Sequence, residues 1–571
     1  MRKLKIAAVT AALLCAGAAG AVPAKPGLRT AVQPDGSVVT YRVIGDEHAH
    51  YMTAPDGQTL LTEDEGRICY ARLDGSRLVS TGVSARSAVP ANAVRLADLP
   101  APIKAPARVP DNMLTTTFPS SGTPRALVVL VEYTDVKFKV ADPKAHFEAM
   151  LNEEGYDRYG AIGSARDYFK ECSGGKFVPV FDVYGPVTLK YNRSYYGRNV
   201  GYGDDQYAHR MAIEACGQLD GQIDFTVYDT DADGFIDNVY VFYAGMGEAD
   251  SSVTNSVWPH SHDIEYTDDE CPVFDGVTLN HYATSNELEG DTSDYSGDPA
   301  GISTFCHEFS HVLGLPDIYA TSYITAYTPG EWDLMDSGTY NASGHIPPYY
   351  TAFERLSMHW IEPRVLTEPD DIVLRPISTG DACLIPTGLD NEFFLLENRQ
   401  LEGYDVALPG HGMLIWHIDY RQSIWDNNRV NNTASHQYVD LEEADNIQSN
   451  YKSSRAAEPF PGTRGVTSFT DDTKPGMLTW GRARLETPIT DITEGNGNIT
   501  FKVKGGKTDG IGELAAIETG VRVNGRNVIG AQEIWRPDGT LVGRGTDMTL
   551  PAAGIYILVG RDGSRHKVSV R

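Results

Sequence analysis

One stretch of the chain constrains its fold and chemistry more than any other: Cys306 to Asp317, which reads Cys-His-Glu-Phe-Ser-His-Val-Leu-Gly-Leu-Pro-Asp. His307 and His311 are four residues apart, and on a helix such residues lie on one face, one turn from each other. Both imidazoles can therefore bind a single Zn²⁺. Glu308 would lie beside the metal rather than on it, where it can act as a general base on water. The alternative is an exposed helical turn without a metal.

The residues after the second histidine favour the metal site. Gly314 can end the helix in a left-handed turn, and Pro316 prevents the helix from restarting. The chain then turns back, so that Asp317 can reach the metal from outside the helix. Further on, residues 331–338 read Glu-Trp-Asp-Leu-Met-Asp-Ser-Gly and place Met335 in a turn-like setting.

These motifs resemble a zincin of the metzincin type. More closely, they resemble the immune inhibitor A family of secreted bacterial metallopeptidases. The similarity extends over roughly residues 30–504 and includes further segments: Ala126–Asp135, Gly163–Phe169, Asp231–Asp237, Phe394–Arg399 and Leu408–Gly412.

The resemblance implies a role for each residue of the central stretch. His307 and His311 are expected as zinc ligands, Glu308 as the general base and Met335 as the Met-turn methionine. Asp317 fits the extended motif as third ligand, although metzincins usually have a histidine there. The alternatives nearest in sequence are Glu331 and Glu354.

A length of 571 residues predicts several domains. We expect a multidomain α+β protein in which a zincin-like catalytic domain is flanked by a β-rich propeptide, a β-sandwich and a small C-terminal β-domain. The expected boundaries are a signal peptide at 1–21, the propeptide at 22–112, the catalytic domain at 113–365, the sandwich at 366–504 and the last domain at 505–571.

Residues 1–21 read as a secretory signal, with a basic start, an apolar run and a small-residue cleavage site. Cys15 raises the alternative of a lipoprotein, but the bulky Leu14 precedes it. The apolar run is too short to span a bilayer stably, and no later run is longer, so we expect no stable membrane insertion. The net charge of −29 argues against nucleic acid and anionic membranes as partners.

Residues 22–112 alternate short β-like runs with turns and end in a proline-rich linker. A small domain ahead of a protease suggests a propeptide that keeps the enzyme latent. Cys69 could cap the zinc as a thiolate, and the alternative is a buried structural cysteine. Six cysteines follow the signal without C-x-x-C spacing, so one or two disulfides could form but cannot be paired.

Within residues 113–365, the apolar run Ala126–Glu132 predicts a strand that is buried on both faces. The pattern also predicts helices at 145–153, 164–172 and 204–217, and strands at 178–184 and 238–244.

A second cluster of acidic residues precedes the last of these strands. Asp229, Asp231 and Asp233 occupy alternate positions, a glycine follows at the sixth place and Asp237 stands at the ninth, as in an EF-hand-type Ca²⁺ loop. The twelfth position is Tyr240 instead of glutamate, so the loop is not a complete EF-hand. The alternative is a solvated Asp/Gly turn.

Other polar residues near the motif are weaker candidates. Three histidines, His260, His262 and His281, fit a surface or hydrogen-bonded role better than a catalytic one. Tyr340 and His345 follow the Met-turn and could stabilise an oxyanion.

The last two regions contain short strand-like runs between turns. Residues 366–504 fit a β-sandwich that either binds a ligand or supports the catalytic domain. Residues 505–571 resemble the C-terminal sorting domains of type IX secretion, which implies that machinery as a partner. An ordinary small β-domain is the alternative.

Together these features predict a secreted zinc endopeptidase that is made as a zymogen and acts on proteins or peptides. Two other hypotheses remain. One is a non-catalytic, adhesin-like surface protein on a degenerate protease scaffold. The other is a zinc hydrolase that acts on bonds other than peptides.

Overall fold

The computed structural model describes residues 23–96, 114–507 and 522–570, except residues 26, 46–49, 64–65, 75–76, 115, 117, 201–203, 252, 291–296, 323–325, 390, 449–451, 525, 553 and 561–564. The expected signal peptide and most of the linker between propeptide and catalytic domain lie outside these ranges. Among the described residues, no helix combines the length and the apolar character needed to cross a membrane.

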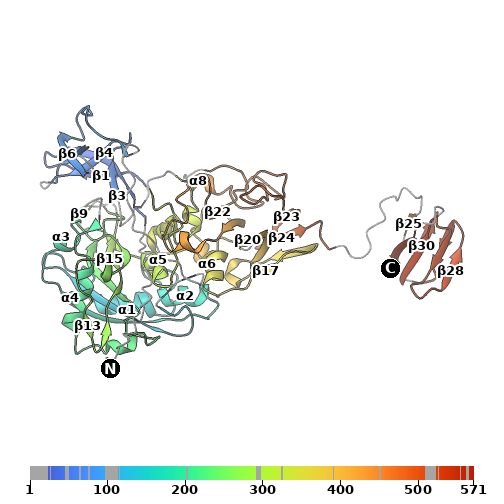
Figure 1. The fold of residues 1–571 in the computed structure, drawn as a ribbon, viewed down its shortest axis with the longest axis horizontal. Coiled ribbons are helices and arrows are strands. Elements are labelled where there is room, and N and C mark those ends of the chain that lie inside the picture. Colours follow the sequence, from blue (N-terminus) through green and yellow to red (C-terminus); the bar gives the residue numbers. More distant parts are fainter. Residues whose placement is uncertain are drawn as a thin grey trace, which may run out of the picture.

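The first described region is a six-stranded antiparallel sheet in which each strand pairs with the next along the chain. Its inner face buries a small apolar core that includes Val39, Tyr41 and Leu60. The sheet is drawn in blue in Figure 1. Its strands are β1 (Arg29–Val32), β2 (Val38–Gly45), β3 (His50–Thr53), β4 (Thr59–Thr62), β5 (Ile68–Asp74) and β6 (Arg77–Ser84).

The next region is built on a mixed sheet with the strand order β12-β15-β11-β7-β8. Strands β15, β11, β7 and β8 run parallel, whereas the edge strand β12 is antiparallel to β15. The strands are β7 (Arg125–Glu132), β8 (Val180–Thr188), β11 (Val239–Met246), β12 (His260–Asp263) and β15 (His281–Glu289), and β16 (Asp298–Pro299) also pairs with β15.

Helices cover both faces of this sheet (Figure 1). Val128 and Leu130 of β7 point into a core shared with α1 (Pro143–Asn152), α2 (Ala165–Cys172) and α5 (Ile302–Val312). The alternate residues of β7 point into a second core, shared with α4 (His209–Leu219). Burial on both faces explains why the strand is apolar at every position from Ala126 to Val131.

The predicted strands and helices of this region are present, with shifted ends. The largest shift is at α4, which begins at His209 instead of residue 204, because Asp204 and Asp205 pair with β9 as the short strand β10. The remaining short elements are α3 (Arg193–Tyr196), β9 (Asn199–Val200), β13 (Val273–Phe274), β14 (Val277–Thr278) and α6 (Ala352–Ser357).

Residues after 363 form two facing sheets with an apolar core between them. The core on α5 continues into this region and includes Leu395, Trp416 and Val439, so it crosses the predicted boundary at residue 365. The first sheet has β17 (Arg364–Val365), β19 (Cys383–Leu389), β20 (Glu392–Arg399), β21 (Gly412–Asp419) and β22 (Val439–Leu441), and the second has β18 (Asp370–Leu374), β23 (Ile489–Gly495) and β24 (Asn498–Val503). Two four-residue helices, α7 (Gln422–Trp425) and α8 (Lys452–Arg455), lie in its connections.

The last described region has its own small core and two sheets. One sheet contains β25 (Arg522–Asn524), β26 (Asn527–Ile529) and β29 (Asp547–Thr549), and the other contains β27 (Glu533–Trp535), β28 (Leu541–Arg544), β30 (Gly554–Val559) and β31 (Arg565–Val570).

The six cysteines of the described residues are free, so the disulfides that the sequence allowed are not formed. Five of them are buried.

Candidate metal centre

Helix α5 carries the two histidines, and its buried position holds their side chains away from solvent. The Nε2 atoms of His307 and His311 lie 3.2 Å apart. Nδ1 of His307 contacts the carbonyl oxygen of Leu334 at 2.8 Å, and Nδ1 of His311 contacts that of Leu315 at 2.7 Å. A carbonyl can only accept, so each Nδ1 carries a hydrogen and each neutral ring has its lone pair on Nε2. The two lone pairs therefore converge.

The end of α5 brings a carboxylate to the same point. Gly314 adopts a left-handed φ of +90°, and the N–H groups of Gly314 and Leu315 donate to the carbonyls of His311 and Ser310. This is the helix end that the sequence predicts. The chain turns back, and Oδ1 of Asp317 lies 3.2 and 3.3 Å from the two imidazole Nε2 atoms.

These three atoms fit a zinc ion. Two donors bound at about 2.0–2.1 Å with tetrahedral angles lie about 3.3 Å apart, close to the separations found here. An ionised carboxylate and two imidazole lone pairs that meet in a buried place call for a cation.

The turn around Met335 lies against the first histidine. Asp333 Oδ1 accepts a hydrogen bond of 2.7 Å from the Met335 N–H. The Met335 carbonyl accepts another from Ile318 N, next to Asp317. Because Leu334 in the same turn receives the His307 Nδ1–H, this turn orients one candidate ligand and the loop that carries another.

The third candidate ligand is held by a residue that sequence reasoning missed. Oδ2 of Asp317 accepts a 2.5 Å hydrogen bond from Asn428 Nδ2, and the Asp317 N–H donates to Asn428 Oδ1 at 2.7 Å. Asn431 and Asn432 fix the same loop through the Ile318 carbonyl and the Thr321 hydroxyl. Asn428 is 111 residues beyond Asp317, and no spacing motif connects the two.

Glu308 is fully buried on α5, next to His307. Burial raises the pKa of the Tyr240 phenol, and the charge of Glu308 raises it further, which places Tyr240 near this carboxylate. Tyr340 also lies within reach of the charge of Glu308. The Tyr340 hydroxyl donates to the carbonyl of Pro23, in the first described segment of the chain.

The other predicted ligands lie elsewhere. Glu331 forms an ion pair with Arg455 at 2.9 Å. Glu354 caps α6, where its Oε2 accepts the Thr351 N–H. Cys69 is buried in β5 of the N-terminal sheet. Among the described residues, the group that gathers at His307 contains neither these glutamates nor Cys69.

The acidic loop forms a second group of candidate ligands from Asp229, Asp231 and Asp233. Asp237 does not join them. It is buried at the start of β11, and its two oxygens accept hydrogen bonds from the N–H and the hydroxyl of Thr230 at 3.0 and 2.6 Å. Burial raises the pKa of Asp237 to about 6.

The histidines on the sheet edge make ordinary hydrogen bonds. Nε2 of His260 contacts the Tyr282 hydroxyl at 2.8 Å, and Nδ1 of His281 contacts Asp263 at 2.5 Å. His345 lies 3.3 Å from Glu289.

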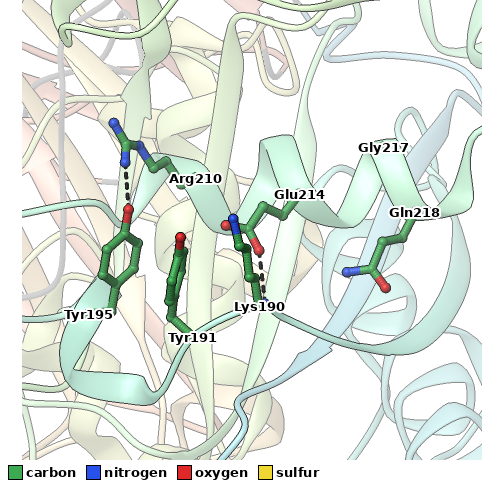
Figure 2. A pocket seen from close by; sticks show the side chains of 7 residues that line it. All are labelled: Lys190, Tyr191, Tyr195, Arg210, Glu214, Gly217 and Gln218. Carbon is green, nitrogen blue, oxygen red and sulfur yellow. Dashed lines mark hydrogen bonds between the residues drawn. The ribbon is translucent and has the colours of Figure 1, made fainter.

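A pocket of about 440 Å³ lies on the outer side of α4, away from the histidine pair. Figure 2 shows Arg210 joined to the Tyr195 hydroxyl and Glu214 joined to the backbone of Lys190. Its lining contains no group of metal ligands, so this pocket is not the candidate active site.

Comparison with known proteins agrees with this geometry. Residues 119–364 match the model of the immune inhibitor A peptidase M6 catalytic domain. This is narrower than the span of roughly residues 30–504 over which the sequence resembles that family.

Two curated relatives are similar over part of the chain. The pre-pro-metalloprotease PrtV of Vibrio cholerae serotype O1 is 28% identical in an alignment of length 237 that covers 37% of this chain and 25% of the relative. Immune inhibitor A of Bacillus thuringiensis subsp. alesti is 26% identical in an alignment of length 261 that covers 38% of this chain and 36% of the relative. The chain thus spans about a quarter to a third of the relatives' length. The match and the similarities support a metallopeptidase of the immune inhibitor A kind in residues 119–364.

Proposed function

We propose that the protein is a secreted, zinc-dependent endopeptidase. The observation that carries the proposal is the buried convergence of His307 Nε2, His311 Nε2 and Asp317 Oδ1 within 3.3 Å, with Glu308 beside them. The match to a metallopeptidase domain supports it. We assign His307, His311 and Asp317 as zinc ligands and Met335 as the Met-turn methionine.

The residues divide the chemistry as follows. A bound zinc ion would supply the Lewis acidity that activates water and polarises the scissile carbonyl. Glu308 accepts the proton that the attacking water loses and passes it to the nitrogen of the leaving amine. Asn428 and the Leu334 carbonyl hold Asp317 and His307 in place. We infer that the Tyr340 hydroxyl, which binds the Pro23 carbonyl in this chain, contacts the substrate carbonyl once Pro23 has left.

We propose that residues 22–112 are a propeptide. Several contacts fasten this region to the catalytic region: Pro23 to Tyr340, the backbone of Lys25 to Ala249, and His50 stacked on Trp258 with ring centroids 4.4 Å apart. The charge of Glu308 contributes to the raised pKa of Tyr340, so the contact of Pro23 with Tyr340 supports a place for the propeptide in the catalytic cleft. Removal of the propeptide would free this place for substrate.

Two finer assignments complete the proposal. Asp229, Asp231 and Asp233 would bind Ca²⁺, with the backbone carbonyl of Phe235 at the seventh position of the loop. Residues 505–571 would act as a type IX sorting domain. In a bacterium with that machinery, deletion of residues 505–571 should retain the protein inside the cell, and normal export of the truncated protein would exclude this role.

The function is tested on the full chain with a cleavage site for an unrelated protease inserted in the linker of residues 97–113. After this linker is cut, we expect cleavage of casein that stops with a zinc chelator and returns with added Zn²⁺. Folded protein that binds zinc and cleaves no protein would favour a hydrolase of another bond. Folded protein that binds no zinc would favour the adhesin-like alternative.

A further inference from the structure

A pair of acidic residues lies beside the first described segment of the chain. Asp250 is only 7% exposed. Its Oδ1 has no hydrogen-bond partner among the residues that the structure describes. Glu289, at the end of β15, is the second acid; its side chain is 14% exposed, and its Oε1 lies 3.3 Å from His345 Nε2. A buried carboxylate oxygen without a partner, such as Asp250 Oδ1, is costly.

The two carboxyls influence each other. Burial raises the pKa of Asp250 to about 6, while Lys25 and Arg29 lower it. Burial also raises the pKa of Glu289 well above its usual value, and the charge of Asp250 adds to this while Lys25 opposes it. The charge of Lys25 therefore acts on both carboxyls, and the charge of Arg29 acts on Asp250 as well.

Backbone contacts explain why Lys25 lies beside Asp250 and Glu289. Its N–H donates to the carbonyl of Ala249, adjacent to Asp250, at 2.9 Å. Four residues on, the buried guanidinium of Arg29 donates to the carbonyls of Glu248, Ala249 and Ser251. The segment is thus held against the loop after β11 at two points, with its lysine beside the acidic pair.

Tyr340 links the acidic pair to the proposed catalytic centre. Burial raises the pKa of its phenol, and the charges of Asp250, Glu308 and Glu289 raise it further. His345, five residues after Tyr340, lies 3.3 Å from Glu289. The Tyr340 hydroxyl binds the carbonyl of Pro23, two residues before Lys25. A peptide chain that passes Glu308 can therefore present a side chain to the acidic pair within a few residues.

We propose that Asp250 and Glu289 form a subsite that selects a lysine or arginine side chain near the bond that is cut, and that Lys25 fills this subsite in the unprocessed chain. This inference rests on the peptidase function proposed above. It adds a substrate class: polypeptides with a basic residue at one fixed distance from the cleavage site.

The test uses the zinc-loaded full chain after cleavage of its linker. The probes are internally quenched peptides of one sequence, with lysine, arginine, norleucine or glutamate at each of the four positions on either side of the bond. At one position we expect kcat/KM for lysine and arginine to exceed that for norleucine by about tenfold or more, a size typical of a close charge pair at an interface. Glutamate should be the poorest.

Asp250→Asn and Glu289→Gln should each reduce this ratio severalfold. Asp472→Asn, which removes an equal charge from an exposed residue far along the chain, is the matched control and should leave the ratio unchanged.

The outcomes separate the two proposals. Absence of cleavage for every peptide would overturn the peptidase function itself. Equal rates for lysine and norleucine at all positions would overturn the subsite, and so would a basic preference that survives both variants.

Occupation of the subsite by Lys25 is tested in the chain whose linker has not been cut. Lys25→Met should raise the residual cleavage of the lysine peptide above that of the wild type, whereas Lys25→Arg should match the wild type. Equal residual rates in the wild type and in Lys25→Met would show that Lys25 does not fill the subsite.

Discussion

The protein contains two groups of candidate metal ligands that differ in almost every physical respect. His307, His311 and Asp317 are buried, and other parts of the chain hold each of them by a hydrogen bond. Asp229, Asp231 and Asp233 are partly or fully exposed. Their oxygens accept hydrogen bonds from the N–H groups of Asp233 and Gly234 in the same loop.

The difference shows how a fold prepares a metal site. In the buried group, two lone pairs and one carboxylate meet where water cannot solvate them. Folding has therefore already brought these groups together against the free-energy cost of their desolvation, before any metal binds. In the exposed loop, water and local N–H groups stabilise the carboxylates without a metal. We therefore expect the first site to bind its metal tightly and to be required for activity, and the second to bind weakly.

The largest effect is expected from the loss of a direct ligand. His311→Ala should lower zinc affinity by more than about 100-fold, the upper end of what a supporting residue costs, and should abolish casein cleavage. Zinc affinity is measured by competition with a chromogenic chelator. Retention of tight zinc binding in this variant would show that the ligand set is assigned wrongly.

The next effect tests how the fold supports the buried site. Asn428 has a left-handed φ of +50°, so glycine removes its amide without backbone strain. Asn428→Gly should lower zinc affinity by about 10- to 100-fold, as loss of a supporting hydrogen bond does at other metal sites. Asn427→Gly, at the neighbouring residue, is the control. Equal zinc affinity in both variants would show that Asp317 needs no support.

A third effect concerns pH. Burial and the adjacent Glu354 raise the pKa of Asp333 well above its usual value, and burial raises the pKa of Glu354 to about 7. Asp333 Oδ2 and Glu354 Oε1 are buried and have no hydrogen-bond partner among the described residues. The two charges repel each other, which favours a proton on one of the carboxyls, and Asp336 and Glu397 add negative charge nearby. A raised pKa in the folded state stabilises the fold at low pH, and this stability is lost as pH rises through that pKa.

Thermal stability should therefore fall between about pH 4.5 and about pH 7, where the unfolded chain has lost the proton that the folded chain still holds, with a slope of up to about 1.4 kcal/mol per pH unit for each such proton. Asp333→Asn keeps a donor toward Glu354 at every pH and should flatten this slope. A melting profile with the same slope in the variant would assign the loss to other groups.

The smallest effect is expected at the exposed loop. Addition of Ca²⁺ at about 100 times its dissociation constant should stabilise the folded chain by about 2.7 kcal/mol. Asp231→Asn should remove most of this gain and leave zinc content unchanged. If Ca²⁺ stabilises the wild type and the variant equally, the loop is a solvated turn.

The central helix could be predicted from the sequence because its information is local. The spacing of His307 and His311, the glycine that ends the helix and the return to Asp317 all lie within twelve residues, and the structure has each of them. Strand β7 could be predicted from the sequence equally well, because burial on both faces leaves an uninterrupted apolar run.

Features that depend on distant residues could not be predicted. Asn428 meets Asp317 only because the region after residue 365 shares a core with α5. Asp250, Glu289 and Lys25 come together through contacts across more than 200 residues, and no local pattern marks them. Asp237 follows the expected loop spacing, yet burial at the start of β11 turns it toward Thr230.

The most direct test of the account compares the wild type with Glu308→Gln, each with its linker cut. Zinc content and casein cleavage are measured on the same samples. The account predicts close to one zinc ion per chain at the histidine site in both proteins and cleavage only by the wild type. A folded wild type without zinc, or a Glu308→Gln variant that cleaves casein near the wild-type rate, would contradict it.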